Sequence, residues 1–191
     1  MASWDMGKDW QAGYISAVKQ LRNAGITNVL MVDGPGYGQE VNAMYQYCRG
    51  VRDADTTGNI MFSVHFYSSS GKDESTIKSS LDNARNQGLC TIAGEFGWTH
   101  SGTQIPYQYI MKHCNENNIG YISWSWTGNG GSDYVLDLVD RDSGELTDWG
   151  KGVFEGKDGV PGIKETAKKP YNGASTGGSQ TTTEATTQTT T

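Results

Sequence analysis

Short apolar segments alternate with helix-like segments at a regular interval along most of the chain. The apolar segments begin near positions 29, 60, 90 and 120, and a spacing of about 30 residues is the length of a strand–helix–strand unit. Helical periodicity occupies the other stretches, over residues 8–23, 41–52, 75–87 and 105–117. Four such units in succession predict a parallel sheet with right-handed crossovers.

Two architectures use this unit, a doubly wound open sheet and a (β/α)8 barrel. The first strand, Val29–Val32, shows no polar–apolar alternation, which favours a strand covered on both faces. The position of polar and aromatic residues separates the two architectures, because in a barrel the carboxyl ends of the strands surround one cavity. We therefore favour the barrel fold class, with only its last four β/α units in this chain. The residues at these strand ends are Asp33, His65, Tyr67, Glu95 and Trp124.

Glu95 follows the apolar run 89–93 and lies between two glycines, at 94 and 97. A carboxylate at the end of a buried strand is costly unless it is paired or hydrogen-bonded, so a chain that places one there usually uses it. His65 and Tyr67 are two residues apart on the preceding strand and share a face. A tyrosine hydroxyl on that face could orient Glu95 as a nucleophile. The structural alternative is a core-edge carboxylate beside a satisfied core histidine and tyrosine.

Two tryptophans, Trp124 and Trp126, end the last apolar segment, and a strand there would place both on one face. Indole rings at a cavity mouth suit the apolar C–H faces of sugars. The structural alternative is a pair of large core residues, and we expect it to hold for at least one of the two.

Three motifs resemble the second half of a family 5 glycoside hydrolase, most closely the bacterial β-mannanase type. They are His65-Phe66-Tyr67, Gly94-Glu95-Phe96-Gly97 and the segment 124–130, and residues 31–39 also resemble that subgroup's fifth-strand loop. The likeness runs from about Ser3 to Gly156. It implies a (β/α)8 barrel and a retaining, endo-acting hydrolase of β-1,4-linked polysaccharide, with mannan favoured over glucan and no metal or cofactor.

By the same resemblance, Glu95 corresponds to the nucleophile and Tyr67 to the tyrosine that hydrogen-bonds it. His65 corresponds to the histidine near the acid/base, and Trp124 to the tryptophan under the sugar at the cleavage point. Trp126 either lines the cleft or fills the core. The expected site is therefore catalytic Glu95 with the substrate-binding residues His65, Tyr67, Trp124 and Trp126.

A retaining glycosidase also needs a second carboxyl group, about 5 to 5.5 Å from the nucleophile. The resemblance implies a glutamate after an asparagine for this role, and no such pair precedes the first helix. Asn115-Glu116 falls within a predicted helix, and Asp33 is the remaining strand-end carboxylate but is a poor match. We therefore expect the chain alone to be inactive. The alternative function is a non-catalytic carbohydrate-binding protein or an inert truncated fragment.

Composition excludes several other classes. A net charge of −6 with scattered basic residues gives no sign of a nucleic-acid partner, and no apolar run of about 18 residues predicts a membrane span. The histidines lack zinc-site spacing, and the three cysteines lack a C-x-x-C pair and are interpreted as buried small hydrophobes. The loop 34–38 loosely echoes a nucleotide-binding G-x-G-x-x-G, but Gln39 stands where the third glycine belongs.

We divide the chain into residues 1–169, the C-terminal half of a catalytic barrel, and residues 170–191, a threonine-rich linker too polar to fold that we expect to precede a further module. The expected location is extracellular, although residues 1–5 have no signal-peptide features. A half-barrel leaves two strand edges unpaired and one sheet face uncovered, which predicts self-association.

Overall fold

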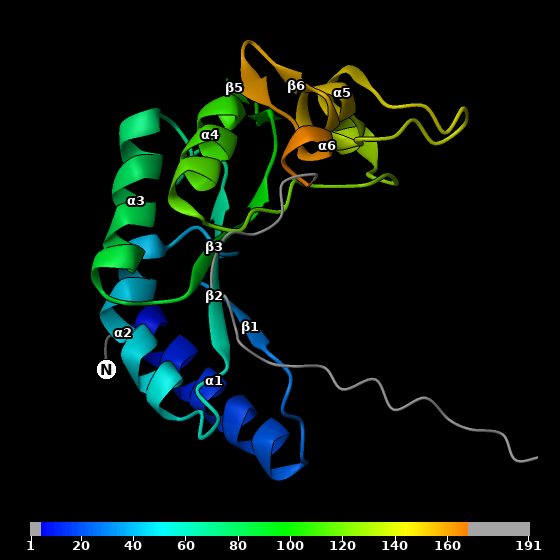
Figure 1. Cartoon of the computed structure of the whole chain (residues 1–191). Coiled ribbons are helices and arrows are strands. Elements are labelled where there is room, and N and C mark those ends of the chain that lie inside the picture. Colours follow the sequence, from blue (N-terminus) through cyan, green and yellow to red (C-terminus); the bar gives the residue numbers. More distant parts are fainter. Residues whose placement is uncertain (1–4, 168–191) are drawn as a thin grey trace, which may run out of the picture.

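The computed structural model describes residues 5–167 (Figure 1). A parallel sheet in the order β1-β2-β3 is formed by Leu30–Asp33, Ile60–Phe66 and Thr91–Phe96. The helices α1 to α4 span Met6–Asn23, Val41–Asp53, Glu74–Asn86 and Tyr107–Asn117. Each boundary lies close to the predicted one, so the alternation of helix and strand is confirmed up to residue 117.

Local sequence sets where the helices begin and end. The side chain of Asp5 accepts a hydrogen bond from the Lys8 N–H at the start of α1, and Asp73 does the same for the Thr76 N–H at the start of α3, which satisfies backbone donors that have no partner within the helix. α1 ends at Asn23, and Gly25 follows the C-cap residue Ala24 with a φ of +84°, a backbone conformation that favours glycine.

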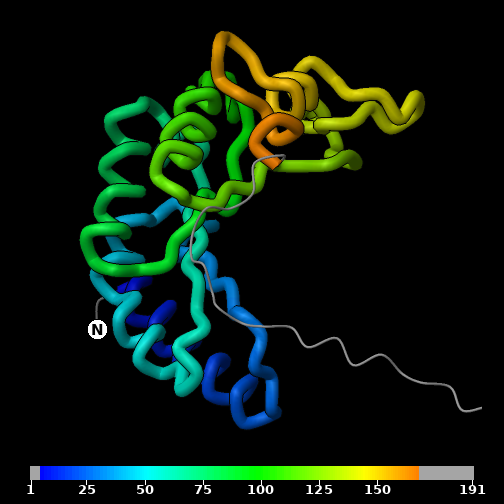
Figure 2. Tube along the Cα trace, viewed as in Figure 1, coloured from blue at the N-terminus to red at the C-terminus, as the bar shows by residue number. Residues whose placement is uncertain are grey.

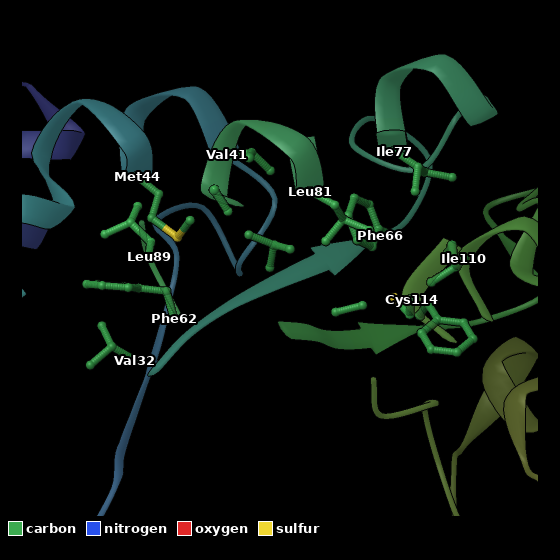
Figure 3. Packing of buried hydrophobic residues seen from close by; sticks show 14 of the residues in the cluster. Val32, Val41, Met44, Phe62, Phe66, Ile77, Leu81, Leu89, Ile110 and Cys114 are labelled. Atoms are coloured by element: carbon green, nitrogen blue, oxygen red, sulfur yellow. The ribbon is translucent and has the colours of Figure 1, made fainter. Parts of the chain in front are cut away.

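The helices cover one face of the sheet, and the core lies between them and the strands (Figures 1 and 2). Along β2, the alternate residues Ile60, Phe62, Val64 and Phe66 belong to this core, as expected for the two-residue period of a strand. Figure 3 shows the apolar side chains of this interface. They include Val32, Phe62 and Phe66 from the strands and Met44, Ile77, Leu81 and Ile110 from the helices.

β1 is not covered on both faces as its sequence suggested. Val32 faces the helices and is 2% exposed, whereas its neighbour Met31 is 49% exposed. The difference arises because the helices lie on one side of β1, while no described segment packs over Met31 on the other side. The inner face of the sheet is therefore open at this strand.

The segment predicted as a fourth strand, 121–126, is not a regular strand. Tyr121 forms an isolated parallel bridge with Ala93, and the Trp124 N–H donates to the Phe96 carbonyl. The chain then leaves β3, because the next residue, Ser125, exchanges backbone hydrogen bonds with the later segment 136–138. The peptide bond between Trp124 and Ser125 is cis.

The remaining elements lie beyond the predicted repeat or within its loops. They are the hairpin β4–β5 (Thr99–His100 and Thr103–Gln104), the 3-10 helix η1 (Gly131–Leu136), α5 (Asp148–Phe154), the hairpin β6–β7 (Gly156–Lys157 and Val160–Pro161) and α6 (Ile163–Thr166). The predicted linker, residues 170–191, lies outside the described residues. Within 5–167, no helix is long and apolar enough to cross a membrane.

The three cysteines are free, and two of them are buried as expected. Cys90 is exposed instead, and this prediction was wrong. Cys90 directly precedes β3, and the adjacent Leu89 takes the buried position in the core.

Candidate active site

The side chains at or next to the carboxyl ends of the three strands lie close together. His65 Nε2 lies 3.1 Å from Asp33 Oδ1, and His65 Nδ1 lies 3.5 Å from Glu95 Oε2. The Tyr67 hydroxyl donates to the same Glu95 oxygen over 3.1 Å. The strand ends therefore bring Asp33, His65, Tyr67 and Glu95 into one cluster, as a barrel arrangement predicts.

The cluster is buried on one side and open on the other. The His65 side chain is 10% exposed, whereas those of Glu95 and Asp33 are 28% and 47% exposed. Burial raises the pKa of Tyr67, and the negative charge of Glu95 raises it further, so Tyr67 stays protonated and remains a hydrogen-bond donor at neutral pH. The Glu95 carboxylate is therefore held by a hydrogen bond from Tyr67 and remains partly exposed.

A bulge in the sheet aims Glu95 at this cluster. Val64 of β2 pairs with Ala93 of β3, but the next β2 residue, His65, pairs with Glu95, so that Gly94 is the extra residue. A Cβ at Gly94 would lie only 1.8 Å from the buried Ser63 Oγ. Glycine is therefore required at this bulge, and the bulge places Glu95 beside His65.

The glycine-rich loop after β1 holds His65 from the other side. The Gly38 carbonyl accepts a hydrogen bond from the His65 N–H over 2.9 Å. Gly38 has a φ of +77°, and a Cβ there would lie 2.3 Å from Cγ of the His65 ring. The glycines that resembled a nucleotide-binding loop thus allow this loop to approach His65 closely.

Trp124 is held by a short chain of polar contacts that the sequence did not reveal. Its Nε1 donates to Asn129 Oδ1 over 3.1 Å, and the Asn129 Nδ2 donates to the buried Asp137 over 2.6 Å. Burial raises the pKa of Asp137, but the backbone N–H groups of Asn129 and Gly128 lower it more, so that it lies below its ordinary value. Asp137 is therefore an anion that fixes the loop 128–129 and, through Asn129, the Trp124 ring. The only sequence signal was the Gly-Asn-Gly run.

Neither Trp124 nor Trp126 is a core residue, contrary to what we expected of at least one of them. Trp124 is 41% exposed and Trp126 is 61% exposed. Trp126 packs edge-on against Phe154 of α5 with ring centroids 6.2 Å apart, and no described hydrogen bond or ring contact joins it to the Glu95 cluster. The tryptophan that enters the core is Trp149, whose Nε1 donates to the Trp124 carbonyl over 3.1 Å.

His100 is a further residue at the site that sequence reasoning missed. Its ring lies 5.0 Å from that of Tyr67, centroid to centroid, and its Nδ1 is 2.6 Å from Ser68 Oγ. It sits on the short hairpin directly after the Glu95 strand. The hairpin therefore adds a second wall beside Tyr67.

Among residues 5–167, no cluster of histidine, cysteine or acidic side chains has the arrangement needed to hold a metal ion. A cavity of about 660 Å³ opens behind the loop 128–137, and Trp98, Tyr134, Arg141 and Trp149 are among the residues that line it. Glu95 is not among its lining residues, so this cavity is separate from the strand-end cluster.

Known proteins resemble this chain in both sequence and fold. The sequence model of the family described as Cellulase (glycosyl hydrolase family 5) matches residues 1–130. A mannan endo-1,4-beta-mannosidase of Salipaludibacillus agaradhaerens is 39% identical over 87% of this chain and 53% of its own length. Another, from Streptomyces lividans, is 34% identical over 88% of this chain and 45% of its own.

Solved structures of beta-mannanases also resemble this chain. The mannohexaose complex of Thermomonospora fusca beta-mannanase superposes with a TM-score of 0.75 at 37% identity, over 84% of this chain and 52% of that one. Beta-mannanase from Streptomyces thermolilacinus gives 0.76 at 37% identity, over 84% and 53%. The chain thus spans about half the length of the relatives it matches, and its sheet and helices form half of a (β/α)8 barrel.

Proposed function

Because the chain belongs to glycosyl hydrolase family 5, we propose that it supplies the nucleophile half of a retaining, endo-acting β-1,4-mannanase site, with Glu95 as the nucleophile. The contact that carries this proposal is the Tyr67 hydroxyl on Glu95 Oε2, with His65 beside the same oxygen. Mannan is favoured over β-glucan because matched relatives are named for mannan.

The geometry suits a displacement at the anomeric carbon. Tyr67 and His65 both contact Oε2 of Glu95, which leaves Oε1 for the attack. As the bond from Oε1 to the anomeric carbon forms, the bond from that carbon to the leaving oxygen breaks, and water later hydrolyses the glycosyl-enzyme. Tyr67 keeps the carboxylate in one orientation throughout.

Aromatic surface beside Glu95 suits a sugar ring. Trp124 is fixed next to β3 by its backbone bond to Phe96 and by its indole bond to Asn129, and its exposed face can stack on the C–H surface of a mannose. We assign Trp124 to the sugar at the cleavage point and His65 to a substrate hydroxyl. Trp126 is assigned to a more distant part of the chain of sugars.

A second carboxyl group is required for protonation of the leaving oxygen. Asp33 is the other carboxylate of the cluster, but it is hydrogen-bonded to His65 and is one methylene shorter than a glutamate. We therefore propose that residues 5–167 contain no acid/base, and that the chain alone does not hydrolyse mannan or β-glucan. Release of reducing sugar by the purified chain, abolished by Glu95→Gln, would contradict this.

The nucleophile can be tested without the missing acid. A 2-deoxy-2-fluoro-β-mannobioside with a dinitrophenyl leaving group needs no protonation to depart, so Glu95 alone should become glycosylated. Mass spectrometry of the digested protein should show the label on the peptide containing Glu95 and none in Glu95→Gln. Tyr67→Phe should slow labelling by about tenfold or more, the effect of losing a hydrogen bond to a charged group. Labelling that persists in Glu95→Gln would refute the assignment.

Carbohydrate binding without chemistry is the competing function, favoured by the exposed Trp124. Affinity electrophoresis in a mannan gel separates the two. Retardation that is lost in Trp124→Ala, with no labelling of Glu95, would identify a binding protein. No retardation and no labelling would identify an inert fragment. The same gel with Trp126→Ala tests its assignment, since we expect a smaller loss there.

We also propose that residues 1–169 act as one catalytic half-domain and residues 170–191 as a linker, and that the protein works outside the cell, where its polymeric substrate is found. Limited proteolysis should cut within 170–191 first and leave the preceding part intact. Early cleavage inside the half-domain would argue against this division.

A further inference from the structure

The cavity behind the loop 128–137 has no role in the proposed function. Its volume is about 660 Å³, a size typical of ligand sites. All of its lining residues come from 98–157, so one continuous part of the chain forms it. In Figure 1 the labelled elements around it, α4, α5 and β6, lie together at the upper end of the molecule. We call this space the Trp98 cavity.

Aromatic rings supply much of the lining of the Trp98 cavity. The four are Trp98, Tyr107, Tyr134 and Trp149. Tyr107 and Trp149 are buried and meet edge to face, with ring centroids 4.7 Å apart. The indole N–H of Trp98 donates to the Val135 carbonyl over 2.8 Å, and that of Trp149 donates to the Trp124 carbonyl over 3.1 Å. Because both indole N–H groups are bonded to the backbone, the two rings are held in place and offer carbon atoms to a ligand.

Charged side chains of both signs also line the cavity. They are Asp137, Asp140, Asp148, Arg141 and Lys157. The two cationic side chains are exposed, and neither makes a hydrogen bond or a salt bridge with any residue in 5–167. Acidic and basic groups nearly balance, so charge favours neither an anion nor a cation as the ligand. Hydroxyl groups suit this lining, because they accept hydrogen bonds from Arg141 and Lys157 and donate them to carboxylates.

We propose that the Trp98 cavity is a second saccharide-binding site, separate from the Glu95 cluster, and that it takes a neutral β-linked oligosaccharide. Flat aromatic surface packs against the C–H faces of sugar rings, and the charged groups bind their hydroxyls. A neighbouring cavity of about 580 Å³ shares Trp98, Tyr107 and Lys157 with this one and adds Gln104 and Gln108. It provides room for further sugar units. That the saccharide is a mannan rests on the proposed function, whereas the lining of the cavity requires only a saccharide.

The second site lies directly behind the residues that hold Trp124. Asn129 accepts from the Trp124 indole and Trp149 donates to the Trp124 carbonyl, and both line the Trp98 cavity. A polymer held in the cavity therefore stays beside the Glu95 cluster while another stretch of it binds there. Two sites that bind one polymer raise the effective concentration at each other. The cavity thus serves to retain polysaccharide at the strand ends.

Isothermal titration of the full chain with mannohexaose tests the site. The titrations use the Trp124→Ala background, which removes the sugar platform of the Glu95 cluster but leaves Asn129 bonded to Asp137. Mannohexaose should still bind. Arg141→Ala should weaken this binding by about tenfold, the effect of losing a hydrogen bond to a charged group.

Two further variants and a spectroscopic readout locate the binding. Tyr134→Ala, at a ring that is 66% exposed, should weaken binding by about threefold through lost stacking. Arg49→Ala is the matched control, because it removes an exposed arginine from α2 and should leave the affinity unchanged. In protein labelled with 5-fluorotryptophan, mannohexaose should shift the fluorine signal that is missing from Trp98→Phe.

The outcomes separate this proposal from the proposed function. Binding that is weakened by Arg141→Ala and not by Arg49→Ala supports the second site, and it does so whether or not Glu95 becomes labelled by the fluorinated mannobioside. Absence of that label refutes only the catalytic assignment. Equal affinity for cellohexaose would support a saccharide site and overturn its assignment to mannan. No binding of either hexaose, binding indifferent to Arg141→Ala and Tyr134→Ala, or an unshifted Trp98 signal would overturn the second site.

Discussion

Replacing Gly38 by alanine should disturb the active site through a single atom. The new Cβ would lie 2.3 Å from Cγ and 2.6 Å from Nδ1 of His65, whereas carbon atoms pack at about 3.5 to 4.0 Å. The ring cannot turn aside freely, because it is buried and its Nε2 is bonded to Asp33. Either the loop or the ring must move by more than about 1 Å.

The cost has two parts that the chain itself can separate. A left-handed φ costs a residue with a Cβ about 1 to 2 kcal/mol, and an overpacked contact adds about 1 to 3 kcal/mol. Gly102 has the same φ of +77° as Gly38, but apart from Gly102 itself and its two chain neighbours no residue has a heavy atom within 4 Å of the point that a Cβ at Gly102 would occupy. Gly102→Ala should therefore show the first cost alone, and Gly38→Ala should show both.

Urea unfolding at one low protein concentration measures the difference. With a slope of about 1 to 3 kcal/mol per molar urea, the midpoint of Gly38→Ala should lie about 1 M below that of Gly102→Ala. Labelling of Glu95 should also slow in Gly38→Ala only, because His65 contacts the nucleophile. Equal midpoints and equal labelling rates in the two variants would refute the role assigned to this loop.

Three further outcomes follow from buried groups. Asp55→Ala should lower the free energy of unfolding by about 3 to 5 kcal/mol, because it strands the buried Arg22 guanidinium; Glu116→Ala, in an exposed pair, should cost less than about 1 kcal/mol. The hydrogen bond from Arg22 holds the pKa of Asp55 below its ordinary value. The contribution of Asp55 to the free energy of unfolding, measured as the difference between wild type and Asp55→Asn in chemical denaturation, should therefore be complete above about pH 4 and shrink as the pH falls further. A free-energy difference that stays constant down to about pH 2 would contradict this. An aromatic disulfide reagent should modify one thiol rapidly, that of Cys90, and should reach the other two only on unfolding, because burial raises the pKa of Cys114 to about 12 and also that of Cys48; three equal rates would contradict this.

The helix and strand positions were predictable up to residue 117 because each element carries its own periodic signal. The convergence at the site was predictable for a related reason, since parallel strands end at the same edge of a sheet. The prediction of a regular strand over 121–126 was wrong because it assumed that the whole segment pairs with the preceding strand, whereas Ser125 pairs with the segment 136–138. Such a partner, reached across a glycine-rich loop, leaves no periodic trace in the sequence.

The supporting contacts of the site were not predictable for the same reason. Asp137 accepts a hydrogen bond from Asn129, eight positions before it and on the other side of η1, and nothing in the residue spacing marks that contact. The exposure of Met31 was missed because an apolar run alone does not say which face of a strand is covered. The sequence therefore indicates the reacting groups better than it indicates what holds them in place.

The lack of space beside Gly94 couples the substitutions that positions 63 and 94 can accept. A methyl group at 94 collides with Ser63 Oγ, so position 94 can gain a side chain only in a background where residue 63 has already lost one. A scan of single substitutions will report Gly94 as intolerant, although Ser63→Gly followed by Gly94→Ala exchanges the volume between neighbouring strands. The substitution at Ser63 must therefore come first, because the reverse order passes through a variant with a collision at the bulge that positions Glu95.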